Sequence, residues 1–454
     1  MSKTVKIRKG LDINLLGGSE KVIETLNLPK EVAIKPSDFH GLNPKVVVKE
    51  GEQVKAGQII FFDKYNESIK CATPVSGTVK QILRGDKRKI MEVIISVDSN
   101  QEYVSGSPAK LESLSGEQVK EVMLNAGLWV FVKQRPLDIV ATPSNAPKAI
   151  FVSGFDSSPL APDYNFLLDG QESDFQAGLD ALAKLTTGKV HLTLNGKEKS
   201  SSVLANAKGV QINTIIGKHP AGNVGTQIHH IDPVNKGEFV WTVNALDVLI
   251  IGRYFNTGKF DATRTIALSG SEVIAPKYYK TIIGASIDDL VNGQIKTDGN
   301  VRYISGNVLT GDRIASNGNL GYYHNQVTVI PEGDHYKFFL TTGWLGLGFD
   351  KFSNSRLFPT FLTPNKKFRL DTNTNGEERA FVVTGELEKV FPFDILPMQL
   401  VKAAITDDID GMENLGIYEV APEDFALCEY VCTTKIDIQD KIRQGLDLIG
   451  RECM

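Results

Sequence analysis

Four short apolar runs, each ending in glycine, recur between residues 149 and 252 and alternate with segments of helical character. The runs are AIFVSG (149–154), KVHLTLNG (189–196), VQINTIIG (210–217) and DVLIIG (247–252). Near-continuous runs of this length are typical of parallel strands that are buried on both faces. Between them, residues 175–185 predict a helix capped by Ser173, and residues 202–207 predict a shorter one. The alternation predicts a Rossmann-like α/β domain over residues 101–258.

A well-marked helix opens this domain. Ser115 is expected as its N-cap, Gln118 completes a capping box, and Gly127 ends it. The sequence LWVFVKQRP follows directly, at residues 128–136.

A glycine-punctuated all-β unit comes first, between residues 46 and 97. Its first half, VKEGEQVKAGQ (48–58), is similar to the hammerhead of biotinyl and lipoyl carrier domains. We therefore assign residues 1–100 to an N-terminal segment and a barrel-sandwich hybrid domain. A carrier lysine would lie near residues 65–67, and Lys64 lacks the flanking residues found where biotin or lipoate is attached. A modified carrier and a structural docking barrel both remain possible interpretations, and the sequence favours the barrel.

The rest of the chain predicts three further parts. Residues 259–318 predict a β-grasp-like (SLBB-like) α+β domain in which Ser286 caps a short helix. Residues 319–393 are aromatic and glycine-interrupted, and they predict a β-rich segment without an assigned fold. Residues 394–454 predict a C-terminal helical domain with helices at 394–405, 422–432 and 437–450. The expected fold class is thus multi-domain α/β and α+β.

Length, charge and cysteine content narrow the class of protein. A chain of 454 residues is long enough for about three domains, and its net charge of −4 gives no attraction to nucleic acid. No stretch approaches the ~18 apolar residues of a spanning helix, and the N-terminus lacks the apolar core of a secretion signal. Four scattered cysteines predict free thiols in a reducing cytoplasm.

Two clusters of potential ligands have two interpretations each. The segment HPAGNVGTQIHH (219–230) follows a predicted strand, where an open α/β sheet binds its ligands. Its histidine spacing matches no familiar metal pattern, so a structured glycine turn is favoured over a metal site. Cys428 and Cys432 share a face of a predicted helix, but a closed zinc or iron–sulfur site needs four ligands. Buried small hydrophobic residues are the favoured interpretation.

Several motifs in order along the chain resemble the NqrA family, which provides one subunit of the sodium-translocating NADH:quinone oxidoreductase. They are KGLDINLLGG, GLNPKVVVKEGEQVKAGQIIFFDK, TPVSGTVKQILRGDKRK, GLWVFVKQRP, KHPAGNVGTQIHHIDPV, RYISGNVLTGDR and FALCEYVCTTK. The resemblance runs from about residue 5 to the C-terminus. More distantly, the chain is similar to the RnfC subunit of the Rnf complex and to the NADH-binding flavoprotein subunit of respiratory complex I.

The resemblance implies a flavoprotein scaffold that binds no cofactor of its own. Relatives follow the first helix with a glycine-rich loop for flavin and nucleotide phosphates, whereas this chain has the bulky residues 128–132. NADH, FAD, FMN, riboflavin and iron–sulfur centres are expected on other subunits. The expected partners are the five other subunits of the Nqr complex, NqrB to NqrF, and mainly NqrB in the membrane. The expected location is the cytoplasmic face of the bacterial inner membrane, and the complex reduces quinone while it exports sodium.

A quinone site would need an aromatic slot with a few hydrogen-bonding groups. On an extended strand, Trp129 and Phe131 would lie on one side, and Lys133 and Arg135 would continue it. Phe39 and His40 in DFHGLNP are the other candidates. Trp129 and Phe131 have a competing interpretation as core residues that fill the space left by a cofactor. The alternative functions are a purely structural docking subunit, a soluble NADH-linked flavoprotein and a biotin or lipoyl carrier.

Overall fold

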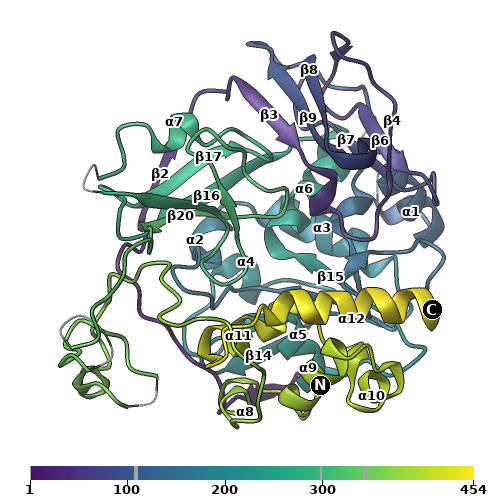
Figure 1. Cartoon of the computed structure of the whole chain (residues 1–454). Helices are drawn as coiled ribbons and strands as arrows, with labels where there is room; N and C mark the ends of the chain where they lie inside the picture. The colour runs from purple at the N-terminus through teal and green to yellow at the C-terminus, as the bar shows by residue number, and fades with distance from the viewer. Residues whose placement is uncertain (1, 107–110, 297–298, 341–342, 344, 355) are drawn as a thin grey trace.

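A computed structural model of the chain describes residues 2–106, 111–296, 299–340, 343, 345–354 and 356–454. It has the mixed α/β architecture expected from the sequence, with a β barrel, a mainly parallel sheet flanked by helices, a second mixed sheet and C-terminal helices (Figure 1). No helix in these ranges has the length and apolar character needed to cross a membrane.

The barrel consists of a four-stranded and a three-stranded antiparallel sheet. The strands are β3 (Glu31–Ile34), β4 (Pro44–Val46), β5 (Gln53–Val54), β6 (Ile59–Asp63), β7 (Lys70–Ala72), β8 (Gly77–Arg84) and β9 (Ile90–Val97). Their orders are β3-β9-β8-β5 and β4-β6-β7. The hairpin between β6 and β7 is the place where a carrier domain would present its lysine, and Tyr65 at its tip is 80% exposed.

The central sheet has the order β1-β14-β13-β12-β15-β10-β11, and its first five strands are parallel. The strands are β1 (Thr4–Lys6), β10 (Lys133–Arg135), β11 (Ile139–Val140), β12 (Ala149–Ser153), β13 (Lys189–Asn195), β14 (Gln211–Ile216) and β15 (Val240–Asn244). The chain runs from β12 through β13 to β14 on one side, and then returns to β15 on the other side of β12. The carboxyl ends of β12 and β15 therefore form a topological switch point, where open α/β sheets bind ligands.

Helices cover this sheet. They are α1 (Gly116–Asn125), α2 (Tyr164–Leu167), α3 (Glu172–Ala183), α4 (Ser202–Ala205), α5 (Val224–Ile231) and α6 (Ala245–Thr257). The capping box of α1 is formed as predicted by Ser115 and Gln118. The prediction that Ser173 caps α3 is wrong, because this helix begins at Glu172 and its N-cap residue is Gln171.

One predicted strand is a helix. Residues 247–252 belong to α6, and the preceding residues 240–244 form the strand β15 instead. An apolar run of this length is compatible with a buried helix as well as with a buried strand. Here most of α6 is buried, including Val248, Ile250 and Ile251, so that no polar face marks its period.

The second sheet has the order β19-β18-β20-β16-β17-β2. Its strands are β2 (Glu20–Thr25), β16 (Thr263–Ser269), β17 (Lys277–Ile282), β18 (Val301–Ser305), β19 (Asp312–Ile314) and β20 (Gln326–Pro331). The short helix α7 (Asp288–Val291) lies between β17 and β18 in the sequence. The prediction that residues 319–393 are β-rich is wrong, because β20 is the one strand among their described residues. The N-terminal segment joins the domains, since β1 pairs with β14 and β2 pairs with β17.

The C-terminal helices are α8 (Leu387–Val390), α9 (Pro397–Ile405), α10 (Ile409–Asn414), α11 (Ala426–Val431) and α12 (Ile438–Glu452). They enclose their own apolar core, in which Cys428 and Cys432 are buried. The Cys432 thiol lies 3.0 Å from the Thr434 hydroxyl. In Figure 1, α12 runs across the molecule beneath the central sheet and the barrel.

Candidate functional site

The six residues predicted for a quinone site do not form one cluster. Phe39, Trp129 and Phe131 are buried, with 1%, 0% and 1% of their surface exposed. The alternation expected of Trp129 and Phe131 is wrong, because Trp129–Phe131 form a 3-10 helix (η4) and the strand β10 begins only at Lys133. Val130 between them is therefore buried as well.

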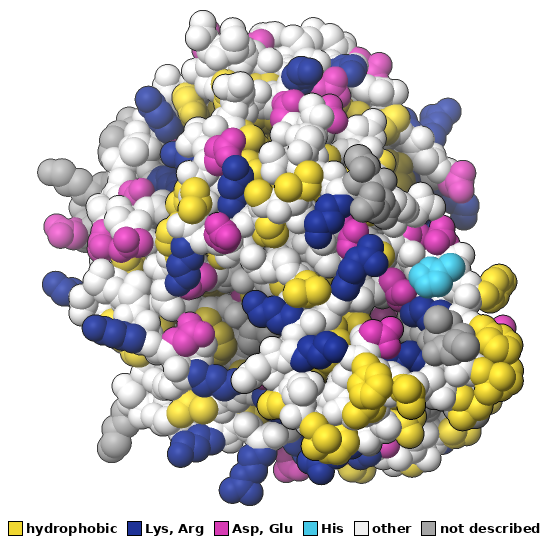
Figure 2. Space-filling view, turned by 90° about the vertical axis from the view of Figure 1, so that its left-hand side faces the viewer, with side chains coloured by type: hydrophobic (Ala, Val, Ile, Leu, Met, Phe, Trp, Pro, Cys, Tyr) yellow, Lys and Arg dark blue, Asp and Glu magenta, His cyan; other side chains and the backbone are white. Residues whose placement is uncertain are grey.

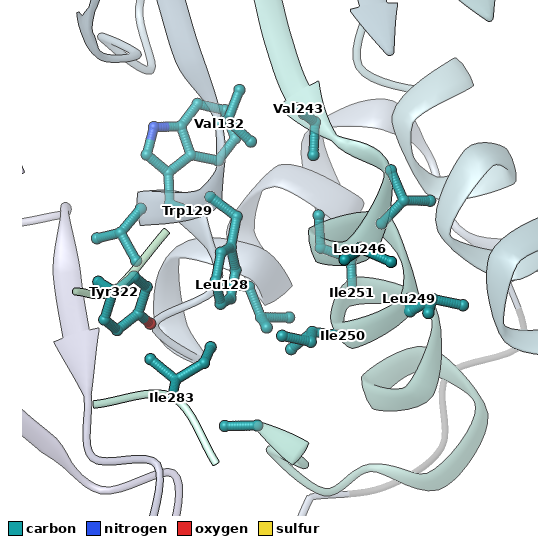
Figure 3. Close-up of a cluster of buried hydrophobic side chains, with 14 of the residues drawn as sticks. Leu128, Trp129, Val132, Val243, Leu246, Leu249, Ile250, Ile251, Ile283 and Tyr322 are labelled. Atoms are coloured by element: carbon teal, nitrogen blue, oxygen red, sulfur yellow. The ribbon is translucent and has the colours of Figure 1, made fainter. Parts of the chain in front are cut away.

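Trp129 has the environment of a core residue. Its indole Nε1 donates a hydrogen bond to the Ala141 carbonyl at 2.6 Å, and its ring packs edge to face on Trp241 at 5.2 Å. Figure 3 shows Leu128 and Trp129 on one side of a buried apolar cluster, with Leu246, Ile250 and Ile251 of α6 on the other. Residues 128–132 thus pack the domain interior at the position where relatives are expected to carry a glycine-rich loop.

Backbone N–H groups at this position also donate hydrogen bonds within the chain. The N–H of Leu128 donates to the Met123 carbonyl at 2.9 Å, that of Phe131 to Leu128 at 3.1 Å and that of Val132 to Trp129 at 2.9 Å. Gly127 has a positive φ of 70°, and a Cβ there would lie 2.7 Å from the Cβ of Ala72 in the barrel. The glycine is needed for the turn and for close packing. A phosphate cradle needs free backbone N–H groups, and these three are bonded within the chain.

Arg135 is also buried, but in an ion pair. Its guanidinium donates to Asp424 and to Glu423, both at 2.8 Å, and it joins the central sheet to the C-terminal helices. Burial raises the pKa of both carboxyl groups, and that of Glu423 reaches about 7. Over a third of the Glu423 side chain is exposed, so solvent weakens this effect for Glu423. Arg135 is therefore placed to hold two domains together.

His40 lies apart from the other candidates. Its Nε2 is 2.8 Å from an Asp447 carboxylate oxygen on α12. Both residues line a broad groove between the barrel and α12, together with Arg84, Arg88 and Arg451. The sequence placed His40 beside Phe39, but Phe39 points into the core against Phe61, Tyr322 and Tyr323.

Two of the six candidates, Phe131 and Lys133, meet at a cleft of about 630 Å³, which we call the switch-point cleft. It lies at the carboxyl ends of β12 and β15, and loops of the second sheet and of the C-terminal helices form its other walls. The residues used below are Asp38, Phe131, Lys133, Asp156, Ser158, Tyr164, His219, Asn244, Asp247, Tyr322, Tyr323, His324, Asn325 and Glu423.

The aromatic wall of the cleft comes from two domains. The Phe131 ring stacks on Tyr322 with centroids 5.3 Å apart. The Lys133 ammonium lies 4.3 Å from the centroid of Tyr323, in cation–π geometry. The hydroxyl of Tyr323 donates to the Val130 carbonyl at 2.5 Å. Phe131 is almost wholly buried, so only its edge reaches the cleft.

The polar wall is largely neutral at physiological pH. Burial lowers the pKa of His219 and of His324 to about 4, so that both rings are uncharged near pH 7. His324 Nδ1 is hydrogen-bonded to the Ser305 hydroxyl at 2.8 Å. Tyr164 contacts Asn244 at 3.1 Å and Asn325 at 3.4 Å through its hydroxyl, and burial raises its pKa.

Three lining residues have a buried oxygen atom without a hydrogen-bond partner among the described residues. They are the Tyr322 hydroxyl, the Ser158 hydroxyl and the side-chain carbonyl of Asn325. Unpaired groups of this kind are costly, and ten others lie outside the cleft lining among the described residues.

Carboxyl groups outnumber basic groups around the cleft. Six carboxyl groups line it against two lysines and one arginine. Burial raises the pKa of Asp38, of Asp156 and of Asp247, and that of Asp247 reaches about 6 despite its ion pair with Arg264. Two helix N-termini at this edge are capped by side chains, since Asp163 accepts from Asn165 N–H and Asn244 from Leu246 N–H, both at 2.9 Å. At the start of α5, Asn223 forms no side-chain cap. Any of these carboxyl groups that is ionised would repel a phosphate-bearing ligand.

Sequence reasoning missed most of this cleft. Asn244 is the last residue of β15, but the strand was expected at 247–252, which moved its carboxyl end eight residues along the chain. His219 was noted after a strand, and the structure confirms its position beyond the end of β14. Tyr322 to Asn325 come from the segment left without an assigned fold. The part of the chain that the structure describes holds no group of three or more potential metal ligands.

Comparisons with known proteins agree with the domain architecture. Family models match residues 5–98 (NqrA N-terminal barrel-sandwich hybrid domain), 114–260 (NqrA second alpha/beta domain) and 265–316 (NQRA C-terminal domain). A similar solved structure is an NAD+-reducing [NiFe]-hydrogenase, at 14% identity over 50% of this chain and 49% of that one. Its TM-score of 0.34 is too low to support an argument.

Curated relatives match over nearly the full length. A protein of Rhodopirellula baltica is 40% identical over 98% of both chains, and one of Marinomonas sp. is 39% identical over 98% of this chain and 99% of its own. A third, of Neisseria meningitidis, is 38% identical over 99% and 100%. All three are named as the A subunit of the Na(+)-translocating NADH-quinone reductase. With this similarity and the three domain matches, the chain belongs to the NqrA family of Na(+)-translocating NADH-quinone reductase subunits.

Proposed function

We propose that the chain is a peripheral subunit of a sodium-pumping NADH:quinone oxidoreductase that binds the quinone ring in the switch-point cleft and binds no cofactor of its own. NADH, flavins and iron–sulfur centres would be held by the five other subunits. The chain would lie on the cytoplasmic face of the inner membrane and contact mainly NqrB in the membrane. Family membership and the full-length similarity to the named relatives support this assignment.

The observation that carries the quinone proposal is the chemistry of the cleft lining. A quinone is a flat, neutral ring with two carbonyl acceptors, which become hydroxyl donors on reduction. Tyr323 offers an aromatic surface, and Lys133, which lies over the ring of Tyr323, offers a cationic donor. The side-chain carbonyl of Asn325 has no partner among the described residues and can accept a hydrogen bond from the reduced hydroxyl.

The same lining argues against a nucleotide or flavin phosphate. Beside the cleft, the N–H groups of Leu128, Phe131 and Val132 are bonded internally, and those carboxyl groups of the cleft that are ionised would repel an anion. Of the six residues predicted for the quinone site, the proposal retains Phe131 and Lys133. Phe39 and Trp129 are assigned to the core, Arg135 to the domain junction and His40 to the groove beside α12.

A titration of the purified chain with a short-chain quinone, followed by tryptophan fluorescence, tests the proposal. We expect saturable quenching, and we expect Lys133→Ala to raise the Kd at least about tenfold, because a hydrogen bond from a charged group contributes ~1.5–3 kcal/mol. Lys55→Ala, a surface lysine paired with Glu102, is the matched control and should bind as the wild type does. Equal affinities for wild type and Lys133→Ala would remove the site from this cleft.

A purely structural docking role is the second candidate. The burial of Phe39 and Trp129 favours it, because two of the predicted quinone contacts are packing residues. Absence of quinone binding to the purified chain, together with retained binding to the other subunits, would support this role.

A further inference from the structure

Residues 336–362, which we call the exposed apolar loop, carry a concentration of apolar side chains that the rest of the surface lacks. Of 24 large hydrophobic side chains that are exposed among the described residues, ten lie in this loop, each at least 45% exposed. They are Tyr336, Phe338, Phe339, Leu340, Leu345, Leu347, Phe349, Leu357, Phe361 and Leu362. Monomeric proteins rarely expose such a patch unless a partner or a membrane covers it.

The loop projects from the body of the protein. In Figure 1 it extends from the second sheet at the lower left, away from the barrel and from α12. Among the described residues of the loop, the short 3-10 helix η5 (Pro359–Leu362) is the one regular element. Figure 2, which faces this side, shows apolar side chains gathered with lysine and arginine between them.

The exposed apolar loop, taken with the five residues that follow it, is basic in a chain that is acidic overall. Residues 336–367 contain five lysine or arginine residues (Lys337, Lys351, Arg356, Lys366 and Lys367) and one acid, Asp350, whereas the whole chain has a net charge of −4. Lys337 pairs with Asp371 at 3.0 Å. Within the described ranges, the other four cations have no carboxylate partner within ion-pair distance. The loop therefore has a positive charge that its own surroundings do not neutralise.

Two of these lysines lie along apolar side chains. The Lys351 ammonium contacts the Gly343 carbonyl and lies 5.0 Å from the Phe358 ring. That of Lys366 donates a hydrogen bond to the Phe349 carbonyl and lies 5.6 Å from the Phe368 ring. This arrangement, with an apolar stem and a cationic tip among aromatic and leucine side chains, is typical of segments that lie at a membrane surface.

We propose that the exposed apolar loop binds the surface of a bilayer that contains anionic lipids. The leucine and phenylalanine side chains would enter the boundary between head groups and acyl chains, and Lys351, Arg356, Lys366 and Lys367 would contact the anionic head groups. A bilayer suits these side chains because it requires no fixed complementary shape. The proposal goes beyond the proposed function and does not depend on the quinone site.

Flotation of the purified full-length chain with lipid vesicles tests this proposal. We expect the chain to float with phosphatidylcholine vesicles that contain phosphatidylglycerol, and to bind pure phosphatidylcholine vesicles about tenfold less, with binding weakened by salt. Leu347→Glu combined with Phe349→Glu should lower binding at least tenfold. Val22→Glu combined with Ile23→Glu, two exposed apolar residues of β2 outside the loop, is the matched control and should bind as the wild type does.

The outcomes separate a lipid surface from a protein partner. Lys366→Glu with Lys367→Glu should weaken binding and flatten its salt dependence, because two positive charges are reversed. Failure to bind either kind of vesicle would overturn the proposal, and so would equal binding by the wild type and the Leu347/Phe349 variant. If the wild type binds no vesicles, and the Leu347/Phe349 variant no longer associates with the membrane subunits, the loop is a protein interface instead. No quinone is present, so failure here leaves the quinone proposal intact.

Discussion

Two aromatic, apolar segments of the chain have opposite environments. Residues 128–132 are buried completely, between the barrel strand β7 and helix α6. The exposed apolar loop at 336–362 has ten large hydrophobic side chains at the surface. The first segment follows a capped helix and leads into β10, so regular elements enclose it. The second has few regular elements beside it. The comparison teaches that composition marks both segments as apolar, but only their neighbours decide which one is core.

The comparison is tested most strongly by a pair of phenylalanine truncations. Phe131→Ala should lower the free energy of unfolding by about 3–5 kcal/mol, because it leaves a cavity in a closed core. Phe349→Ala, which removes a side chain that is 62% exposed, should change it by less than about 0.5 kcal/mol. Urea unfolding followed by near-ultraviolet circular dichroism measures both. Equal effects would refute the contrast between the two segments.

A pair of charged residues sharpens the comparison. Arg135→Met should destabilise the protein by about 3 kcal/mol, because it leaves the buried Asp424 carboxylate without its partner. Arg356→Met, at an exposed position of the loop, should be nearly neutral for stability. The measurement is again the urea midpoint. If Arg135→Met unfolds at the wild-type midpoint, Arg135 does not hold the central sheet to the C-terminal helices.

A smaller effect on stability is expected at His219, which is buried as residues 128–132 are. Its folded pKa of about 4 lies below the ordinary 6.5, so the unfolded chain takes up the proton first. The contribution of His219 to stability is therefore present near neutral pH and is lost as pH falls from 6.5 towards 4. Between pH 7 and pH 5, wild type should lose about 2 kcal/mol more than His219→Gln.

Because the raised carboxyl groups of the cleft titrate in both proteins, their opposite effect cancels in this comparison. Thermal unfolding at several pH values measures the difference. Parallel pH curves for His219→Gln and wild type would show that His219 is not held in its neutral form by burial.

Sequence patterns predicted the elements whose signals are local. The capping box of α1 and the strands β12, β13 and β14 were found because their cues lie within a few residues. Helix α6 was mistaken for a strand because burial on all sides removes its period. The exposed loop gave no regular pattern, and its region was wrongly expected to be β-rich.

The candidate site was harder to predict than the fold. Arg135 meets Asp424, which is 289 residues away in the sequence, and Phe131 meets Tyr322 from another domain. Periodicity carries no information about contacts between domains. The sequence suggested Phe131 and Lys133 as candidates for the quinone site, but only the structure shows that both line the cleft.

The central claim is that the cleft suits a neutral ring rather than a phosphate-bearing cofactor. Isothermal titration calorimetry of the purified chain with a short-chain quinone, with FMN and with NADH tests it most directly. The account predicts saturable heat with the quinone and none with FMN or NADH, because the N–H groups of residues 128, 131 and 132 are bonded internally. Saturable binding of FMN or NADH, or no binding of the quinone, would contradict it.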